Sequence, residues 1–177
     1  MNGAIHQVPY DAKINLPGWR GKKLFMDDVF DAVSGLDPSA IVLFGSAVRD
    51  RFEAVEDSFL WFRTTTPRRV FANDIDVLVI SSHHGEGHRR HRANARFSVV
   101  IGYYEYGGVA TEMRNHADLH LLVISAEEFD RKRAEGWDVA DAVCSEGVLL
   151  AGTFPHAPHR FVRKMFGGYV IRRAKCE

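Results

Sequence analysis

The spacing of apolar residues changes twice in the first quarter of the chain. Residues 22–34 carry apolar side chains at helical spacing, and Gly35 ends this run. Residues 40–44 are continuously apolar, which is typical of a buried strand. Residues 1–21 contain proline and glycine and show no clear period. We therefore expect an irregular N-terminal arm, then a helix, then a core strand.

Further along, the pattern predicts more strands and two helices. Ser125 and Glu128 have the spacing of a capping box, which opens a helix. Gly147 would end a second helix over residues 137–145. The stretches with strand character are residues 75–80, 97–104 and 119–124. Strands interspersed with helices predict an α/β (α+β) fold, in which a mixed β-sheet is flanked by helices.

Composition indicates an ordinary globular chain with no overall charge preference. The 177 residues are 46% hydrophobic, and 23 basic residues balance 23 acidic ones. The first residues lack the basic and apolar regions of a signal peptide, and no run approaches the ~18 apolar residues of a spanning helix. Cys144 and Cys176 lack the spacing of a zinc or disulfide framework. We therefore expect a cytoplasmic protein with no membrane contact and a basic tail at 153–177.

Asp74 and Asp76 stand at the start of the strand expected over 75–80. Because side chains alternate along a strand, both carboxylates lie on one face, about 7 Å apart, while Ile75 and Val77 enter the core. Carboxylates so placed repel each other, and a hard divalent cation such as Mg²⁺ would remove that repulsion. The alternative is that one aspartate caps the strand and the other is solvated.

A Gly45-Ser46 turn follows the strand at 40–44. Glycine lets the backbone approach an anion closely, and a strand-to-helix corner would present N–H groups and a hydroxyl to phosphate. We expect a helix over residues 47–55, with Arg49 one turn inside it and able to reach phosphate oxygens. The alternative is an ordinary strand–turn–helix corner.

Asp118 would complete the set, because it stands at the start of the strand expected over 119–124. A third carboxylate beside a metal pair can ligate the catalytic metal and accept the proton of an attacking hydroxyl. It could equally be only a strand cap. His120 shares a face with Asp118, so it would either line this site or be a hydrogen-bonded core histidine.

In this order the three motifs resemble the polymerase-beta-type nucleotidyltransferase superfamily, and most of all its small nucleotidyltransferase-domain proteins. The matching segments are Gly-Ser-x-x-Arg at 45–49, Asp-Ile-Asp-Val-Leu-Val at 74–79 and Asp-Leu-His-Leu-Leu-Val at 118–123. The resemblance covers residues 22–152, between the N-terminal arm at 1–21 and the basic tail. It implies the palm-like nucleotidyltransferase fold for that segment.

The resemblance also implies a role for each matching residue. Gly45 and Ser46 would hold the phosphates of an NTP, with Arg49 nearby. Asp74 and Asp76 would bind two Mg²⁺ ions, and Asp118 would ligate the catalytic metal and help deprotonate an acceptor hydroxyl.

The acceptor is left open by this resemblance. It would be an RNA end, such as that of a tRNA, or a tyrosine of a partner protein, as in toxin–antitoxin members of the family. A small-molecule acceptor is less expected. From a different class, the chain could be a catalytically silent subunit that binds nucleotide or a partner protein.

Two features depart from the resemblance. Ser46 and Asp74 are 28 positions apart, more than in the small relatives, which predicts an insertion at about 57–72. The insertion would shape the acceptor site or form a surface hairpin. In addition, Asp50 stands where many relatives have glycine.

Other polar and aromatic residues offer secondary candidates. His84, His88 and His91 would share a face and could bind zinc if residues 84–92 were helical, although Gly85 and Gly87 favour a loop. The arginines of this His/Arg-rich segment, 83–96, would contact phosphates or lie in solvent; they are Arg89, Arg90, Arg92 and Arg96. Three tyrosines would stack on a base or, more commonly, enter a core; they are Tyr103, Tyr104 and Tyr106. The tail's basic residues would contact RNA or a partner, or line a solvated helix; they are Arg160, Arg163, Lys164, Arg172, Arg173 and Lys175.

Overall fold

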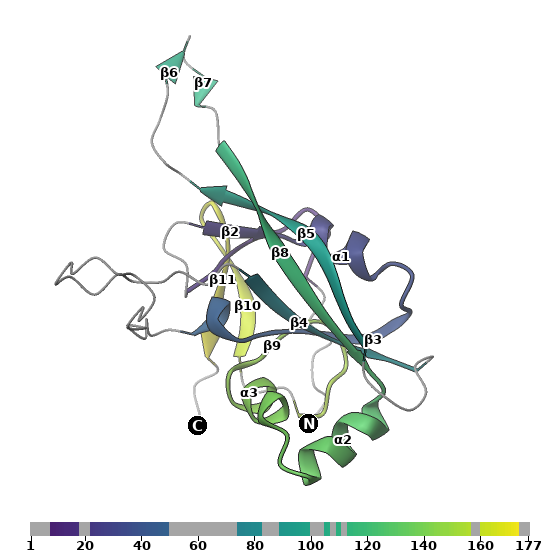
Figure 1. Ribbon diagram of the computed structural model, residues 1–177. Coiled ribbons are helices and arrows are strands. Elements are labelled where there is room, and N and C mark those ends of the chain that lie inside the picture. Colours follow the sequence, from purple (N-terminus) through teal and green to yellow (C-terminus); the bar gives the residue numbers. More distant parts are fainter. Residues whose placement is uncertain are drawn as a thin grey trace, which may run out of the picture.

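The computed structural model describes most of the chain as strands and short helices (Figure 1). The described residues are 8–17, 22–49, 74–82, 89–99, 105–106, 109–110, 113–156 and 160–173. In chain order the elements are β1 (Lys13–Asn15), β2 (Lys22–Phe25), α1 (Met26–Val33), β3 (Pro38–Phe44), the 3₁₀ turn η1 (Ser46–Val48), β4 (Asp74–Ser81), β5 (Arg89–Val99), β6 (Glu105–Tyr106), β7 (Val109–Ala110), β8 (Met113–Ile124), α2 (Ala126–Ala134), α3 (Asp138–Glu146), β9 (Val148–Gly152), β10 (Arg160–Met165) and β11 (Gly168–Arg173). Among these elements, none of the helices has the length and apolar character needed to span a bilayer.

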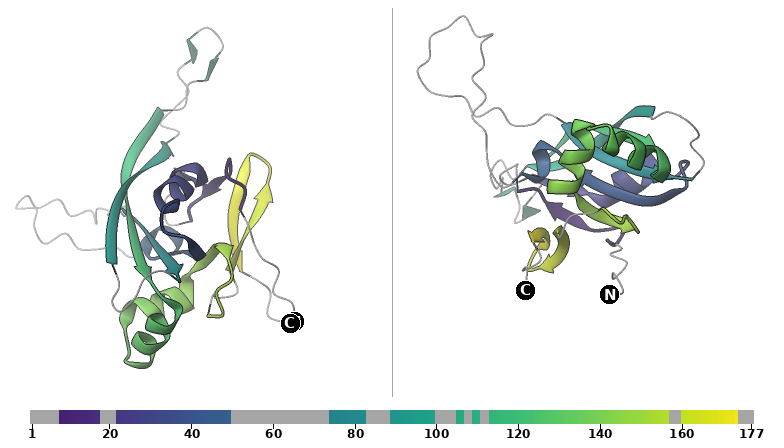
Figure 2. Two further views of the ribbon diagram at one scale, coloured as in Figure 1. Left: turned by 90° about the vertical axis from the view of Figure 1, so that its right-hand side faces the viewer. Right: turned by 90° about the horizontal axis from the view of Figure 1, so that it is seen from below.

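A nine-stranded mixed sheet organises the molecule, in the order β10-β11-β1-β2-β5-β8-β4-β3-β9. Figure 2 shows it strongly curved, with β5 and β8 on one side, β10 and β11 on the other, and α1 between them. The two ends of the sheet, β9 and β10, also approach each other. The predicted mixed sheet flanked by helices is therefore confirmed at this level of detail.

The concave face of the sheet holds the larger of two apolar clusters. Alternate residues of the central strands point into it, including Ile75, Val77 and Val79 of β4, and α1 contributes Met26 and Val29. All five side chains are completely buried. This face of β4 is therefore committed to the core, as the alternation of the sequence predicts.

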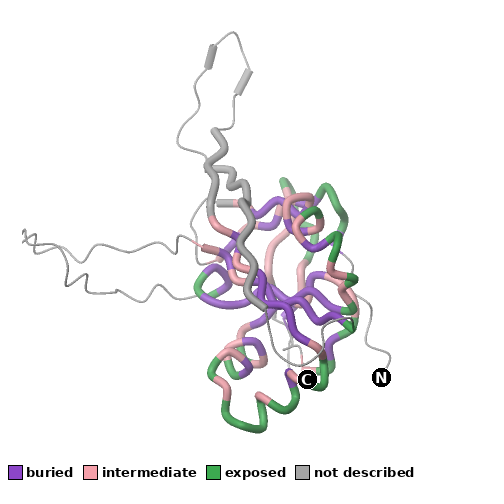
Figure 3. Tube along the Cα trace, turned by 45° about the vertical axis from the view of Figure 1, so that its right-hand side comes forward, coloured by how far each residue is buried: buried purple, intermediate pink, exposed green. Residues whose placement is uncertain are grey.

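The opposite face carries a second cluster beneath α2 and α3. Leu78 and Ile80 of β4 meet Phe129 of α2 and Val143 of α3 there. Buried residues follow the sheet in Figure 3, whereas much of the surface of α2 is exposed. The two helices that cover this face are therefore the two that the sequence predicts after the strand at 119–124.

The predicted cap of α2 is confirmed. The Ser125 Oγ accepts a hydrogen bond from the Glu128 backbone N–H at 3.1 Å, which satisfies one of the exposed N–H groups of the first turn. The Glu128 carboxylate binds the Arg131 guanidinium, at 2.7 and 2.9 Å. The second helix, α3, also ends where expected, with Gly147 following its last residue.

The helix predicted over residues 22–34 is wrong at its start. Residues 22–25 form β2, and only 26–33 are helical, because Leu24 is completely buried and pairs with Ile14 of β1. A helix through His91 is also excluded, since residues 89–99 form β5 and pair with β8 along their whole length. Without that helix, the three histidines cannot share a helical face.

The arm and the tail of the chain both contribute strands to the main sheet. Residues 13–15, expected to be irregular, form β1 between β2 and β11, and Ile14 is completely buried. The tail forms the antiparallel hairpin β10–β11, so the alternative of a solvated helix is wrong. Long-range pairing holds both segments in place, although each is short and mixed in composition.

Several predictions fall outside the described residues. The insertion at 57–72, Asp50 and most of the helix expected over 47–55 lie there, and so do five of the secondary candidates, His84, His88, Tyr103, Tyr104 and Lys175. Tyr106 lies in β6, which pairs with β7.

Candidate metal centre

The parallel pairing of β4 with β8 brings the predicted acidic residues together. Asp74 is the register partner of Asp118, and Asp76 is the register partner of His120. All four lie on the face covered further along by α2 and α3, since Leu78 and Leu122 of the same two strands belong to that cluster. At this end of β4 the four polar side chains remain partly exposed.

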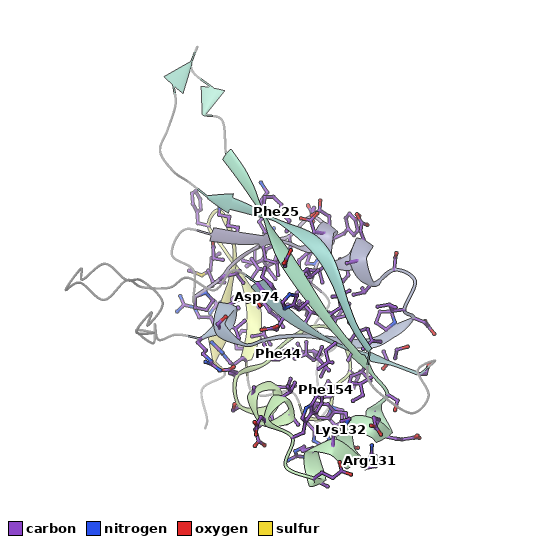
Figure 4. The ribbon with its side chains drawn as sticks, in the orientation of Figure 1. Phe25, Phe44, Asp74, Arg131, Lys132 and Phe154 are labelled. Atoms are coloured by element: carbon purple, nitrogen blue, oxygen red, sulfur yellow. The ribbon has the colours of Figure 1, made fainter. Side chains whose placement is uncertain are left out.

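Three of these side chains point their ligand atoms at one another. The His120 Nδ1 lies 3.2 Å from the Asp74 Oδ2 and 3.7 Å from the Asp76 Oδ1. One ligand atom from each residue lies within 4.8 Å of the others, so this Asp-Asp-His group can hold a metal ion. Figure 4 shows Asp74 on the sheet, apart from Phe154 and Lys132 near α2. The side chains are 41%, 33% and 32% exposed for Asp74, Asp76 and His120, which leaves room for further ligands.

His120 is therefore not a core histidine. Its partly exposed ring lies against the two aspartates, as expected if His120 lines the candidate site. The sequence signal for this was the shared face of Asp118 and His120. The contact with β4, however, depends on a strand register that the sequence does not reveal.

Asp118 occupies a different position from the one expected. It lies inside β8, which begins at Met113, so the alternative of a strand-start cap is excluded. The side chain is partly buried beside Asp74, but it is not a member of the Asp-Asp-His group. Asp118 therefore flanks the group on the same face of the sheet.

Gly45 lies next to Asp76, on the side of β4 opposite His120. Its backbone has φ +79° and ψ −160°, a combination that is essentially restricted to glycine. A Cβ at this position would lie 2.6 Å from the Asp76 Oδ2. The register of β3 and β4, in which Phe44 faces Asp76, creates this close approach. The backbone angles therefore require glycine, and any larger residue would also displace the Asp76 carboxylate.

We expect Gly45→Ala to destabilise the protein by about 1–3 kcal/mol because of the backbone strain. It should also weaken metal binding, because the new methyl group displaces the Asp76 carboxylate. Urea unfolding and Mn²⁺ titration would measure the two effects. Gly35→Ala is the matched control: nothing lies within 4 Å of its Cβ position. Equal behaviour of the two variants would contradict the role assigned to Gly45.

The turn after β3 differs from the predicted helix start. Residues 46–48 form only a 3₁₀ turn, with Gly45 before it, and Arg49 is already extended at φ −70° and ψ 134°. Arg49 therefore does not lie one turn inside a helix. Ser46 is exposed, while Gly45, Ala47 and Val48 are buried, so the turn presents the serine to solvent.

Arg49 joins a network that links this turn to α3 and β10. The Arg49 Nε donates to the Glu146 Oε2 at 2.9 Å. The buried Arg160 donates to the backbone carbonyls of Glu146, at 2.8 Å, and Val48, at 2.7 Å. Arg160 thus has a structural role. The basic composition of the tail, to which Arg160 belongs, does not suggest this role.

Arg160→Met should lower the free energy of unfolding by about 1.5–3 kcal/mol, because the buried Val48 carbonyl and the partly buried Glu146 carbonyl lose a charged donor. Methionine keeps much of the apolar stem, which limits the loss to the hydrogen bonds. Urea unfolding gives the difference, and Arg163→Met, at an exposed site of the same strand, is the control. If both variants unfolded alike, Arg160 would have no structural role beyond that of the exposed tail arginines.

Thiol chemistry is not supported at the described cysteine. Burial raises the pKa of the Cys144 thiol, and Asp141 and Asp130 add to this effect, against an opposing contribution from Arg133. A raised pKa lowers the fraction of reactive thiolate at neutral pH. Cys144 is therefore an unactivated helix residue.

Comparison of the chain with protein-family models, with curated proteins and with solved structures finds no match in any of the three.

Proposed function

We propose that this protein is a divalent-metal-dependent nucleotidyltransferase that moves an NMP from an NTP to an acceptor hydroxyl and releases pyrophosphate. The observation that carries the proposal is the placement of Asp74 and Asp76 at the start of β4. The Gly45-Ser46 turn lies on one side of this pair, and His120 and Asp118 of β8 lie on the other. The three motifs thus meet where the end of β3 and the start of β4 lie beside the middle of β8, which supports a nucleotidyltransferase fold.

The chemistry of the donor set fits a divalent ion. Two carboxylates held on one strand face repel each other, and a cation between them offsets this repulsion. Bound there, Mg²⁺ or a similar ion would polarise the α-phosphate and stabilise charge on the leaving oxygen. Asp74 and Asp76 would be its ligands, with Asp118 positioned beside them for a second ion or for the acceptor.

The chain's own residues would then carry the remaining steps. The exposed Ser46 hydroxyl and the Gly45 backbone would bind the terminal phosphates of the NTP. Asp118 would take the proton of the acceptor hydroxyl as its oxygen bonds to the α-phosphorus. The bond from that phosphorus to the bridging oxygen breaks, and pyrophosphate leaves. Arg49 could assist only by exchanging Glu146 for a phosphate oxygen.

The surface of the tail favours RNA as the acceptor over a partner tyrosine. Residues 154–173 contain no acidic residue. The exposed basic residues of the β10–β11 hairpin are Arg163, Lys164 and Arg172, and Phe166 is completely exposed at its turn. Basic side chains beside an exposed aromatic ring suit a phosphate backbone with unstacked bases.

Transfer of label from α-³²P NTPs tests the proposal. Each common NTP would be incubated with the protein, a divalent ion and either total RNA or total protein. We expect label in RNA, together with released pyrophosphate, and no transfer by the Asp74→Asn/Asp76→Asn double variant. Undiminished transfer by that variant would exclude this mechanism. Metal-dependent nucleotide binding by the wild type without transfer to any acceptor would instead identify a silent binding subunit.

A further inference from the structure

We infer that His120 is itself a metal ligand, through Nδ1, and that it makes the site selective for Mn²⁺ over Mg²⁺. The inference rests on the metal site of the proposed function and specifies its ion. The Mg²⁺ expected from the two aspartates alone assumes a shell made only of oxygen atoms. His120 adds a nitrogen donor to that shell.

The distances match those of neighbouring ligands on one ion. Two donor atoms in adjacent positions of an octahedral shell, each about 2.1 Å from the metal, are about 3 Å apart. The His120 Nδ1 lies 3.2 Å from the Asp74 Oδ2 and 3.7 Å from the Asp76 Oδ1. Small side-chain adjustments would therefore bring all three atoms around one ion.

The backbone holds the imidazole in this position. His120 lies in the long strand β8, and its neighbours Leu119 and Leu121 are 0% and 2% exposed on the opposite face. The pairing of Asp76 with His120 is part of an unbroken parallel ladder. The imidazole can therefore change its rotamer, but it stays on the sheet face that carries the two aspartates. Ligands carried by rigid strands need little reorganisation to bind a metal.

Ligand chemistry then decides which ion is preferred. Mg²⁺ takes oxygen ligands almost exclusively and loses its water reluctantly, whereas imidazole suits transition metals. Mn²⁺ accepts both carboxylate and imidazole and has a size and coordination number close to those of Mg²⁺. An Asp-Asp-His set therefore favours Mn²⁺ over Mg²⁺, while the partial exposure of the three side chains leaves positions for phosphate oxygens or water.

The test compares the wild-type protein with His120→Asn, which places an amide oxygen near the position of Nδ1. Mn²⁺ binding would be followed by electron paramagnetic resonance, with Mg²⁺ as competitor. Spin-echo modulation would report a coordinated nitrogen, and histidine labelled with ¹⁵N would identify its source. His156→Asn is the matched control, because His156 binds Asp130 at 2.6 Å, in a cluster with the α2 residue Phe129.

We expect the wild type and His156→Asn to show nitrogen modulation and to prefer Mn²⁺. His120→Asn should lose the modulation and about 10–100-fold in Mn²⁺ affinity, with Mg²⁺ affinity nearly unchanged. Tight Mn²⁺ binding without nitrogen modulation, or an unchanged ion preference in His120→Asn, would overturn the inference and leave the proposed function intact. Absence of any Mn²⁺ binding that depends on Asp76 would overturn both.

Discussion

Asp76→Asn is expected to slow nucleotide transfer by on the order of 10²–10³-fold, the range found when one preorganised charge-stabilising group is lost from an active site. Asparagine has nearly the same shape, so the contact with Gly45 and the strand pairing remain. It removes a negative charge from the pair, and with it much of the attraction for a divalent ion. Initial rates of pyrophosphate release at saturating NTP would measure the effect.

The variant should fold at least as well as the wild type. Two carboxylates on one strand face repel each other, so removing one charge relieves a cost that the metal-free protein bears. Asp11→Asn, at an exposed turn just before β1, is the control and should keep full activity, because β2, β5 and β8 separate β1 from β4 in the sheet. Loss of activity accompanied by loss of folding, or equal activity in both variants, would contradict the role of Asp76.

Phe129→Ala should lower the free energy of unfolding by about 3–5 kcal/mol, as expected for deleting a buried aromatic ring. Phe129 of α2 is completely buried. Its ring meets Phe154 edge-on at 5.1 Å and Trp137 at 6.3 Å, and it stacks on His156 at 6.0 Å. These rings join α2 to the segments that follow it. The cavity left by Phe129→Ala would therefore weaken the packing of α2 and α3 against the sheet face opposite the concave one.

The chain offers a matched control in Phe166→Ala. Phe166 is completely exposed in the turn of the β10–β11 hairpin, so its loss should change stability by no more than about 0.5 kcal/mol. Urea unfolding of both variants gives the comparison. A small effect at Phe129, or equal effects at the two positions, would show that the aromatic cluster beneath α2 contributes little to stability.

The central strands could be predicted because their apolar pattern reflects burial. Residues 40–44 and 77–80 are continuously apolar, and in β3 and β4 they are covered on both faces. The strands β1, β10 and β11, from the first and last parts of the chain, carry no such signal. Ile14 is completely buried between lysine and asparagine neighbours, and only pairing with distant segments identifies its strand.

In the candidate site, too, some features follow from the local sequence pattern and others depend on long-range pairing. Alternation within one strand was enough to place Asp74 and Asp76 on a shared face. The contact of His120 with them needs the register of β4 and β8, and the requirement for glycine at 45 needs the pairing of β3 with β4. Arg49 meets Glu146, which is 97 positions away. Contacts of this kind depend on tertiary packing, which local pattern does not encode.

Crystals grown with Mn²⁺ and a non-hydrolysable NTP analogue give the most direct measurement of the central claim. We predict an anomalous scattering peak for Mn²⁺ between the carboxylates of Asp74 and Asp76, with the terminal phosphates of the analogue against Gly45 and Ser46. A manganese peak or a nucleotide bound elsewhere, with Asp74 and Asp76 contacting neither, would contradict the account.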